Sequence, residues 1–323
     1  MSIPKSPLVS ICIPTFNRSS YVVRAVQSAL SQTFSDIEVI VSDNCSPDDT
    51  WERLQSFNDS RLRLIRQVEN IGMIPNLNAC LNQARGDLFL LLSDDDALEP
   101  TAIEKLSEPF RKPIYDIEPS VVGLTWAPYF NIDNDGKILW TTQEGPQIES
   151  PVSLVTGLAN GTRGPQLSAV LIRTRDALAV GWYDEERYGA ACDTGNWARV
   201  AMLYQYIVCV QEPLMRYTVH APTAPTATTS ASYQKWQGWI SNLADDTVVL
   251  ARENQGAAAA EQLIKAKRNW LANITSMVLL RYFGKPGWIK LYVAEFWRSR
   301  RFMLTPFVAK RLLKDGWKLF RQR

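Results

Sequence analysis

Short apolar runs alternate with amphipathic stretches over the first hundred residues, and this alternation constrains the fold most strongly. The apolar runs are residues 8–14, 37–42, 62–65 and 87–92. The stretches between them place apolar residues at helical spacing. The last run, DLFLLL, is hydrophobic without interruption, as a central parallel strand buried on both faces should be. The order predicts an α/β fold with a Rossmann-like, mostly parallel sheet and helices on both faces.

The rest of the chain is less regular. We expect strands at 121–126, 137–141, 167–173 and 206–210, and a helix at 193–204. A Pro/Thr/Ala-rich linker at 222–231 separates a domain at 1–221 from a helical C-terminal region at 232–323, with a break at 284–287.

The overall charge of +2 hides an asymmetry between the two ends of the chain. Residues 281–323 hold 12 Lys/Arg against 2 acids, which leaves 23 basic and 31 acidic residues before them. This basic, aromatic-rich tail suits an anionic membrane surface, or alternatively a helical cap that packs on the catalytic domain. No recognised nucleic-acid-binding module is present, so nucleic acid is not an expected partner.

Cysteine usage and the N-terminus both favour a cytoplasmic protein. The five cysteines are scattered and lack CxxC spacing, which fits a reducing compartment. The N-terminus does not have the pattern of a signal peptide, and no 18-residue apolar run predicts a spanning helix.

Polar segments follow three of the predicted strands, at the edge where open parallel sheets bind ligands. They are PTFNR at 14–18, DNCS at 43–46 and SDDD at 93–96. A solvated loop is the common explanation for one such segment, and Asp43 alone could cap a helix. Adjacent acids after a buried strand repel one another, however, and a bound Mg²⁺ or Mn²⁺ would offset that repulsion.

In this order the segments resemble the family 2 glycosyltransferases, which invert configuration at the sugar and have the GT-A fold. The resemblance covers about residues 7–221 and includes residues 70–72 and 84–87 between the second and third segments. It implies a nucleotide-sugar half at about 1–100 and an acceptor half at about 101–221. The donor-binding residues that it implies are Pro14, Thr15, Phe16, Asn17, Arg18, Asp43, Asn70, Asn76 and Asp94.

The same resemblance implies a metal site for Mn²⁺ or Mg²⁺. Asp95 is the principal ligand, with Asp96 and His220 beside it. Ser93 stands where the first Asp of the family's DxD motif is usual, and Cys45 stands where glycine is usual. His220, the only histidine, ends a segment that resembles the family's Tyr-x-x-His element; the alternative is an ordinary core or surface histidine.

Asp193 resembles the family's general base, because it lies six residues before Arg199 on a predicted helix. The alternative is a helix-capping Asp, and both roles can coexist. In the donor site, Phe16 can stack on a base and Asp43 can accept a hydrogen bond from an imide N–H such as that of uracil. For Phe16 the alternative is a core aromatic.

The resemblance therefore predicts a metal-dependent inverting hexosyltransferase that uses a UDP- or dTDP-type sugar donor. The acceptor is a glycan or lipid-linked glycan in cell-surface polysaccharide biosynthesis, as in related bacterial enzymes, and the enzyme can be peripheral at the inner face of the membrane. Two alternatives are a non-catalytic sugar-nucleotide- or membrane-binding protein of the same fold and a sugar nucleotidyltransferase. The latter should have a Gly-rich loop after the first strand, where PTFNR has no glycine. A dinucleotide-dependent oxidoreductase is disfavoured because no GxGxxG is present there.

Overall fold

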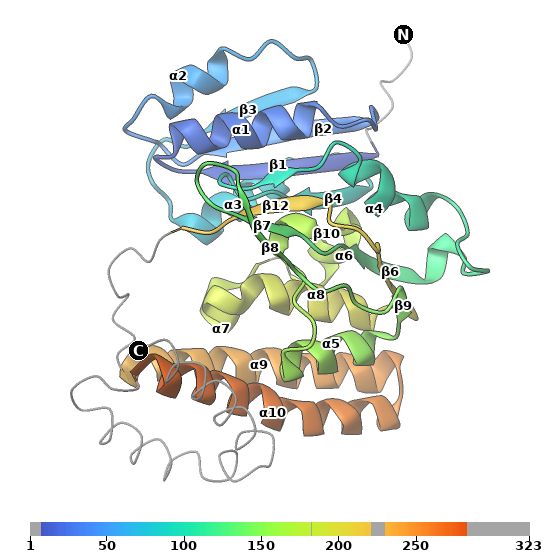
Figure 1. Cartoon of the computed structure of the whole chain (residues 1–323). Helices are drawn as coiled ribbons and strands as arrows, with labels where there is room; N and C mark the ends of the chain where they lie inside the picture. The colour runs from blue at the N-terminus through green and yellow to red at the C-terminus, as the bar shows by residue number, and fades with distance from the viewer. Residues whose placement is uncertain (1–7, 182, 221–229, 283–323) are drawn as a thin grey trace. The chain divides into compact units, whose positions relative to one another are not determined.

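The computed structural model describes residues 8–181, 183–220 and 230–282 (Figure 1). The chain divides into two compact units. The first contains residues 1–151, 164–184 and 196–221, and the second contains residues 152–163, 185–195 and 222–323.

The first unit is built on a sheet in the order β3-β2-β1-β4-β10-β6-β11-β9. Its strands β1 to β4 are parallel neighbours, as the alternating pattern predicts. β10 is antiparallel to both β4 and β6, and β11 is parallel to β6. The strands are β1 (Val9–Thr15), β2 (Ile37–Asp43), β3 (Leu62–Arg66), β4 (Leu88–Leu91), β6 (Val122–Trp126), β9 (Ile148–Glu149), β10 (Val170–Arg173) and β11 (Tyr206–Cys209).

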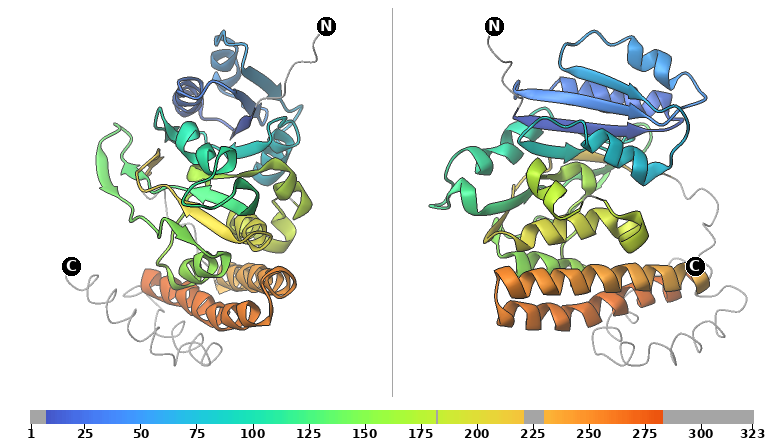
Figure 2. Two further views of the ribbon diagram at one scale, coloured as in Figure 1. Left: turned by 90° about the vertical axis from the view of Figure 1, so that its right-hand side faces the viewer. Right: turned by 180° about the vertical axis from the view of Figure 1, so that it is seen from behind.

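Helices cover both faces of the parallel part of this sheet, because successive strand residues point to opposite faces. On one face, alternate β1 residues such as Ile11 and Ile13 join a buried cluster with α1 (Ser19–Leu30) and α4 (Ala102–Arg111). On the other face, the Cys12 thiol donates to the Cys80 carbonyl of α3 (Met73–Leu81). Figure 2 shows α1 and α3 on opposite sides of the strands. The shorter helices are α2 (Thr50–Gln55) and α6 (Thr174–Ala179).

A second, four-stranded sheet in the first unit has the order β5-β12-β7-β8. Its strands are β5 (Ala97–Leu98), β7 (Phe130–Ile132), β8 (Ile138–Thr141) and β12 (Met215–Thr218). β12 pairs with β5, which directly follows the acidic segment. This pairing brings the end of β12, late in the chain, to the acidic segment that follows β4.

The second unit is helical and contains most of α5 (Pro151–Asn160), α7 (Glu185–Tyr188), α9 (Ser230–Asn254) and α10 (Ala257–Tyr282). Arg187 and Tyr188 of α7 both bond the Asp246 carboxylate of α9, at 2.5 Å for Arg187 Nη2. α8 (Cys192–Met202) begins in this unit. Among the described residues, no helix is both long enough and apolar enough to cross a membrane.

The predicted α/β fold is confirmed, and α9 and α10 agree with the predicted helical C-terminal region. The predicted break at 284–287, the tail beyond 282 and residues 222–229 of the predicted linker lie outside the described residues; residues 230–231 begin α9. Four strands, β5, β7, β9 and β12, were not predicted. Each has two to four residues, too few for a periodic pattern to emerge.

Candidate functional site

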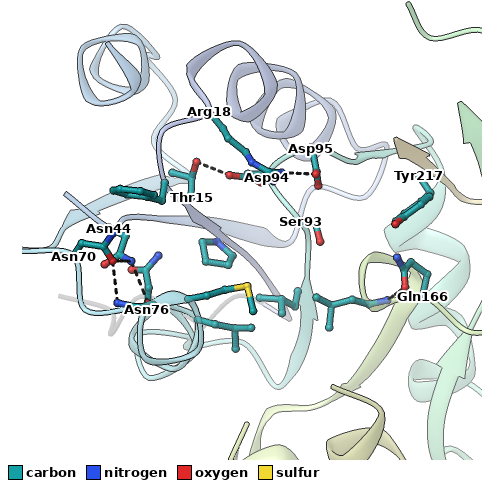
Figure 3. Close-up of a pocket in the computed structure, with 17 residues that line it drawn as sticks. Thr15, Arg18, Asn44, Asn70, Asn76, Ser93, Asp94, Asp95, Gln166 and Tyr217 are labelled. Atoms are coloured by element: carbon teal, nitrogen blue, oxygen red, sulfur yellow. Dashed lines mark hydrogen bonds and ion pairs between the residues drawn. The ribbon is translucent and has the colours of Figure 1, made fainter. Parts of the chain in front are cut away.

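A pocket of about 650 Å³ opens at the carboxyl ends of β1, β2 and β4 (Figure 3). All the residues that line it belong to the first unit. They are Pro14, Thr15, Phe16, Arg18, Asn44, Asn70, Gly72, Met73, Asn76, Leu77, Leu91, Ser93, Asp94, Asp95, Gln166, Leu167 and Tyr217. Figure 3 shows Asn44 and Asn70 at one end of the pocket, Gln166 and Tyr217 at the other, and the acidic residues between them.

The turn after β1 presents Phe16 and Arg18 to this pocket. Asn17 has a φ of 56°, and its N–H donates to Ser46 Oγ at 2.8 Å. Asn tolerates this left-handed conformation better than most residues do. Asn17 therefore shapes the turn and is not part of the lining. Phe16 is 40% exposed, which rules out the core-aromatic alternative and leaves its ring free to face a ligand.

The segment after β2 presents Asn44 to the pocket, while Asp43 lies beneath it. The Asp43 carboxylate accepts bonds from the N–H (3.1 Å) and Oγ–H of Ser46, and its Oδ2 lies 3.4 Å from Arg66 Nε. Oδ2 is buried, and within the described residues it receives no hydrogen bond. The predicted contact between Asp43 and a base stays a prediction, and it requires Asp43 to become accessible.

Asn70 and Asn76 line the pocket with side chains that also bond to the protein. Asn44 Nδ2 donates to Asn70 Oδ1 at 2.8 Å, and Asn70 Oδ1 also accepts from the Gly72 N–H at 3.0 Å. The Asn76 side chain accepts from Ser42 Oγ (2.7 Å) and donates to the Ser42 carbonyl (2.9 Å). These amides fix the loop after β2 against the start of α3.

The three acids after β4 lie in three different environments. Asp94 accepts from Thr15 Oγ1 at 2.7 Å and from Arg18 Nη1 at 3.3 Å, and burial raises its pKa to about 6. Asp96 points inward, where it accepts from Ser168 Oγ at 2.7 Å and from the Thr218 N–H at 3.1 Å. Burial raises the pKa of Asp96 to about 7. Asp95 is in the pocket lining.

Asp95 also meets the histidine at the end of β12. His220 Nε2 lies 2.7 Å from Asp95 Oδ2, and Arg18 Nη1 reaches the same oxygen. The Tyr21 ring packs edge-on against His220 with 5.5 Å between centroids. The structure thus brings together Asp95 and His220, which are 125 residues apart in the sequence. It does not add Asp96 to them, because both Asp96 oxygens are held by other protein groups.

Asp95 and His220 fit a divalent cation as a partial ligand set. A carboxylate oxygen and an imidazole nitrogen are both ligands for divalent metal ions. The Arg18 guanidinium contacts the same carboxylate oxygen, so it must turn away when a cation binds there. The described residues contain no cluster of three His, Cys, Asp or Glu side chains suited to a metal. A cation here would therefore complete its coordination with ligand oxygens and water.

Asp193 is the second residue of α8, and its carboxylate accepts from the Thr194 N–H at 2.5 Å and from Thr194 Oγ1 at 3.2 Å. Burial raises the pKa of this carboxyl above its usual value, while the bonds from Thr194 lower it in part. Asp193 thus accepts hydrogen bonds in the first turn of a helix, and this arrangement leaves its predicted role as a base open.

Some lining residues were not predicted. Asn44, Gly72 and Ser93 lie inside the recognised segments, and Tyr217 lies in the segment that ends at His220, so a signal for them was present. Gln166 and Leu167 had no sequence signal. They precede β10, and they reach the pocket because β10 runs antiparallel to β4, so that its start lies at the carboxyl end of β4.

Comparisons with known proteins agree with this architecture. The family model "Glycosyl transferase family 2" matches residues 10–136. The chain is 38% identical over 140 residues to an Escherichia coli chondroitin synthase, covering 43% of this chain and 19% of that protein. It is also 32% identical over 141 residues to the E. coli "UDP-Glc:alpha-D-GlcNAc-diphosphoundecaprenol beta-1,3-glucosyltransferase WfaP", covering 44% and 53% of the two chains. The chain therefore spans less than two thirds of the length of these relatives.

Among solved structures, S. aureus TarS 1–349 in complex with UDP-GlcNAc has a TM-score of 0.57 at 15% identity, covering 84% of this chain and 80% of that one. At this identity the likeness concerns the fold alone. The matched family segment includes the ends of β1, β2 and β4, which form three walls of the pocket. Residues 10–136 therefore match the family 2 glycosyltransferases, and the chain has the GT-A fold.

Proposed function

We propose that the protein is a metal-dependent inverting hexosyltransferase that moves a sugar from a nucleoside-diphosphate donor to a hydroxyl of a glycan or lipid-linked glycan. One observation carries the proposal: the three strand-end segments and Tyr217 enclose a single pocket, with Asp95 and His220 paired beside it. We favour a UDP- or dTDP-type donor, because Phe16 and Asn44 line the pocket where a pyrimidine can stack on the Phe16 ring, and Asp43 lies directly beneath Asn44.

The donor binds along the pocket with its base near Phe16 and Met73 and its diphosphate near Arg18. Phe16 and Met73 are 40% and 70% exposed, so both offer apolar surface to a flat ring. Arg18 contacts Asp94 and Asp95, and its guanidinium can turn to phosphate oxygens, which it binds in a bidentate manner. Asp94 lies next to Thr15 near the ribose.

Asp95 and His220 would hold Mn²⁺ or Mg²⁺, which neutralises charge on the leaving diphosphate and orients the donor. Asp96 supports this site from beneath. Its bonds to Ser168 and to the Thr218 N–H fix the acidic segment and the end of β12, and thereby the positions of Asp95 and His220.

Asp193 is the proposed general base. Inverting transfer is a single displacement, so the acceptor hydroxyl must lose its proton while it attacks the anomeric carbon. The raised carboxyl pKa of Asp193 makes it a stronger base than an ordinary Asp.

The relatives suggest the biological setting. A chondroitin synthase and a glucosyltransferase named for a diphosphoundecaprenol-linked acceptor both assemble glycans. By analogy, this protein acts in bacterial cell-surface polysaccharide biosynthesis at the cytoplasmic face of the membrane. The basic tail at 281–323 is the proposed membrane contact.

The test is a screen of UDP-, dTDP- and GDP-sugars with Mn²⁺ and Mg²⁺, which records donor hydrolysis and thermal stabilisation. Asp95→Asn should retain the melting temperature of the free protein, lose metal-dependent stabilisation by the donor and reduce turnover by at least about 10²-fold. Asp135→Asn is the matched control, because Asp135 is an exposed residue of the β7–β8 turn.

Full turnover by Asp95→Asn, or by the unchanged protein in excess chelator, would contradict metal-dependent transfer. Donor binding without any turnover, even with lipid-linked acceptors, would instead favour the non-catalytic binding protein. That alternative has no specific observation in its favour.

A further inference from the structure

The edge strand β8 exposes three consecutive apolar side chains. Ile138, Leu139 and Trp140 are 46%, 45% and 53% exposed. Natural edge strands usually carry charges or prolines that prevent pairing with other chains, so an apolar edge with a tryptophan calls for a ligand or partner.

Trp140 is connected by strand pairing to Tyr217, which lines the donor pocket. Tyr217 of β12 pairs with Asn131 of β7, and Asn131 pairs with Trp140 of β8. Side chains that are paired across adjacent strands point to the same face of a sheet, so these three residues form one row. At the usual strand spacing the row is about 10 Å long. Tyr217 lines the pocket at the end opposite Asn44 and Asn70, as Figure 3 shows.

Asn131, in the middle of the row, has a polar group without a partner. Its side chain is 4% exposed, and Nδ2 is buried with no hydrogen-bond acceptor within the described part of the chain. Buried donors are nearly always paired, because an unpaired one loses its bond to water without replacement. The unpaired amide lies between an exposed and a half-exposed aromatic residue, so a rotation of the Asn131 side chain would offer its N–H to an acceptor on a ligand.

The turn between β7 and β8 also contacts a residue that packs beside the proposed metal site. Asn134 Oδ1 accepts from Tyr21 Oη at 3.2 Å, and the Tyr21 ring packs on His220, which bonds Asp95. The turn of the hairpin is therefore linked through Tyr21 to the proposed metal site.

We infer that the row Tyr217–Asn131–Trp140 is the subsite for the acceptor, and that its ligand is the non-reducing end of an oligosaccharide. Trp140 packs against the C–H face of a sugar ring, and the Asn131 amide, after a side-chain rotation, donates to a sugar hydroxyl. Tyr217 marks the boundary between donor and acceptor. This inference rests on the proposed function and names the substrate class that the exposed hairpin recognises.

The test uses calorimetric titration of unsulfated chondroitin tetrasaccharide, hyaluronan tetrasaccharide and cellotetraose into the full chain. At least one of them should bind, and Trp140→Ala should weaken that binding at least about tenfold, while Trp140→Phe restores part of it. Leu139→Ala is the matched control, because it removes apolar surface from the same hairpin without removing the ring. The affinity for UDP with Mn²⁺ should stay within about twofold in all three variants.

Asn131→Leu gives a second, independent measurement. If the amide is kept for a ligand, replacing it with an apolar group of similar size should leave the melting temperature unchanged or higher, yet weaken tetrasaccharide binding. A structural role would produce the opposite pattern, a lower melting temperature with unchanged binding.

Three results would overturn the inference. The first is that no tetrasaccharide binds at millimolar concentration. The second is that Trp140→Ala and Leu139→Ala weaken tetrasaccharide binding equally. The third is that both variants bind tetrasaccharide as the unchanged protein does but lose affinity for phosphatidylglycerol vesicles. The last result would assign the hairpin to a lipid surface. If UDP fails to bind but tetrasaccharide binding depends on Trp140, the proposed transferase function fails and the carbohydrate subsite stands.

Discussion

Two residues in the left-handed backbone region shape the loops around the pocket. Asn17 and Cys45 have φ values of 56° and 62°, and Ser46, next to Cys45, accepts the Asn17 N–H at 2.8 Å. Asn adopts this conformation readily, but a cysteine does so at a cost. The unusual residue at position 45, where the family more often has glycine, is therefore a site of backbone strain beside the donor pocket.

Cys45→Gly should accordingly stabilise the protein. Removing Cβ at this φ relieves a strain of about 1 kcal/mol, offset in part by the greater freedom of glycine in the unfolded chain. The free energy of unfolding in urea should therefore rise by up to about 1 kcal/mol with an unchanged m-value. Cys45→Ala keeps Cβ and should give no gain; an equal gain from alanine would show that the thiol, rather than the backbone, is the source.

Asp193→Asn should separate base catalysis from donor binding. It keeps the size of the side chain and an oxygen that accepts from Thr194, so stability and donor affinity should change little. Sugar transfer should fall by at least about 10²-fold. An early melting transition with normal transfer would mean that Asp193 only stabilises its helix.

The pH dependence of transfer by the unchanged enzyme also tests whether Asp193 is the general base. A base must be ionised, so the rate falls as the pH drops through its folded-state pKa. Burial raises the pKa of Asp193 above 3.8, so the acid limb of the pH–rate profile should lie above that value. Asp193→Asn should lose the limb that Asp193 contributes, while protonation of Asp94 and Asp96, whose pKa values burial raises to about 6 and about 7, still lowers its residual activity.

The resemblance to the family predicted much of the pocket but not the direction of each side chain. Phe16, Arg18, Asn70, Asn76 and Asp94 all line it. Asp43 and Asp96, by contrast, are buried and bonded to Ser46 and to Ser168, respectively. Adjacent acids look alike in a sequence, and only the strand geometry decides which of them faces the ligand.

Among the elements, the contact between β1 and β4 depends on a glycine at the entry to β4. A Cβ on Gly86 would lie 2.6 Å from Ser10 N and 2.9 Å from the Val9 carbonyl carbon. The Gly86 N–H also donates to Ser10 Oγ at 2.8 Å. Because the opposing atoms are backbone, they cannot move aside without shifting a central strand.

Gly86→Ala should therefore destabilise the fold by about 1–3 kcal/mol, measured by urea or thermal unfolding. UDP affinity at low temperature should be retained, because the pocket lies at the opposite end of β4. Gly164→Ala is the control, with no atom within 4 Å of the added Cβ. Equal stability of the two variants would show that the β1–β4 contact tolerates a side chain.

The local pattern predicted the parallel strands but not the second sheet. β1 to β4 each combine an apolar run with a following amphipathic helix or acidic segment, which local periodicity reveals. β5, β7 and β12 are short, and β12 pairs with strands that lie more than eighty residues earlier in the chain. Arg216 Nε, for example, contacts Glu99 Oε1 at 2.6 Å. No local pattern encodes those contacts, so the joining of His220 to Asp95 rested on resemblance alone.

For the whole molecule, the separation of charge along the chain predicts where an anionic surface is bound. Residues 281–323 carry 12 Lys/Arg and 2 acids, with Trp288, Trp297 and Trp317 among them. Residues 283–323 lie outside the described residues, so this prediction depends on composition. Each basic residue near an acidic bilayer contributes roughly 1 kcal/mol at low salt, and screening weakens this as salt rises.

The full chain should therefore sediment with phosphatidylglycerol vesicles at low salt and dissociate as salt increases. Truncation after Tyr282, where α10 ends, should abolish sedimentation while UDP affinity is retained. Replacing Arg298, Arg300 and Arg301 with Gln keeps the length and the aromatic residues, and should shift dissociation to lower salt. Equal sedimentation with phosphatidylcholine vesicles would contradict an electrostatic attachment. If truncation instead lowers the melting temperature and the Gln variant behaves like the unchanged protein, the tail packs on its own domain, because packing depends on apolar surface rather than on net charge.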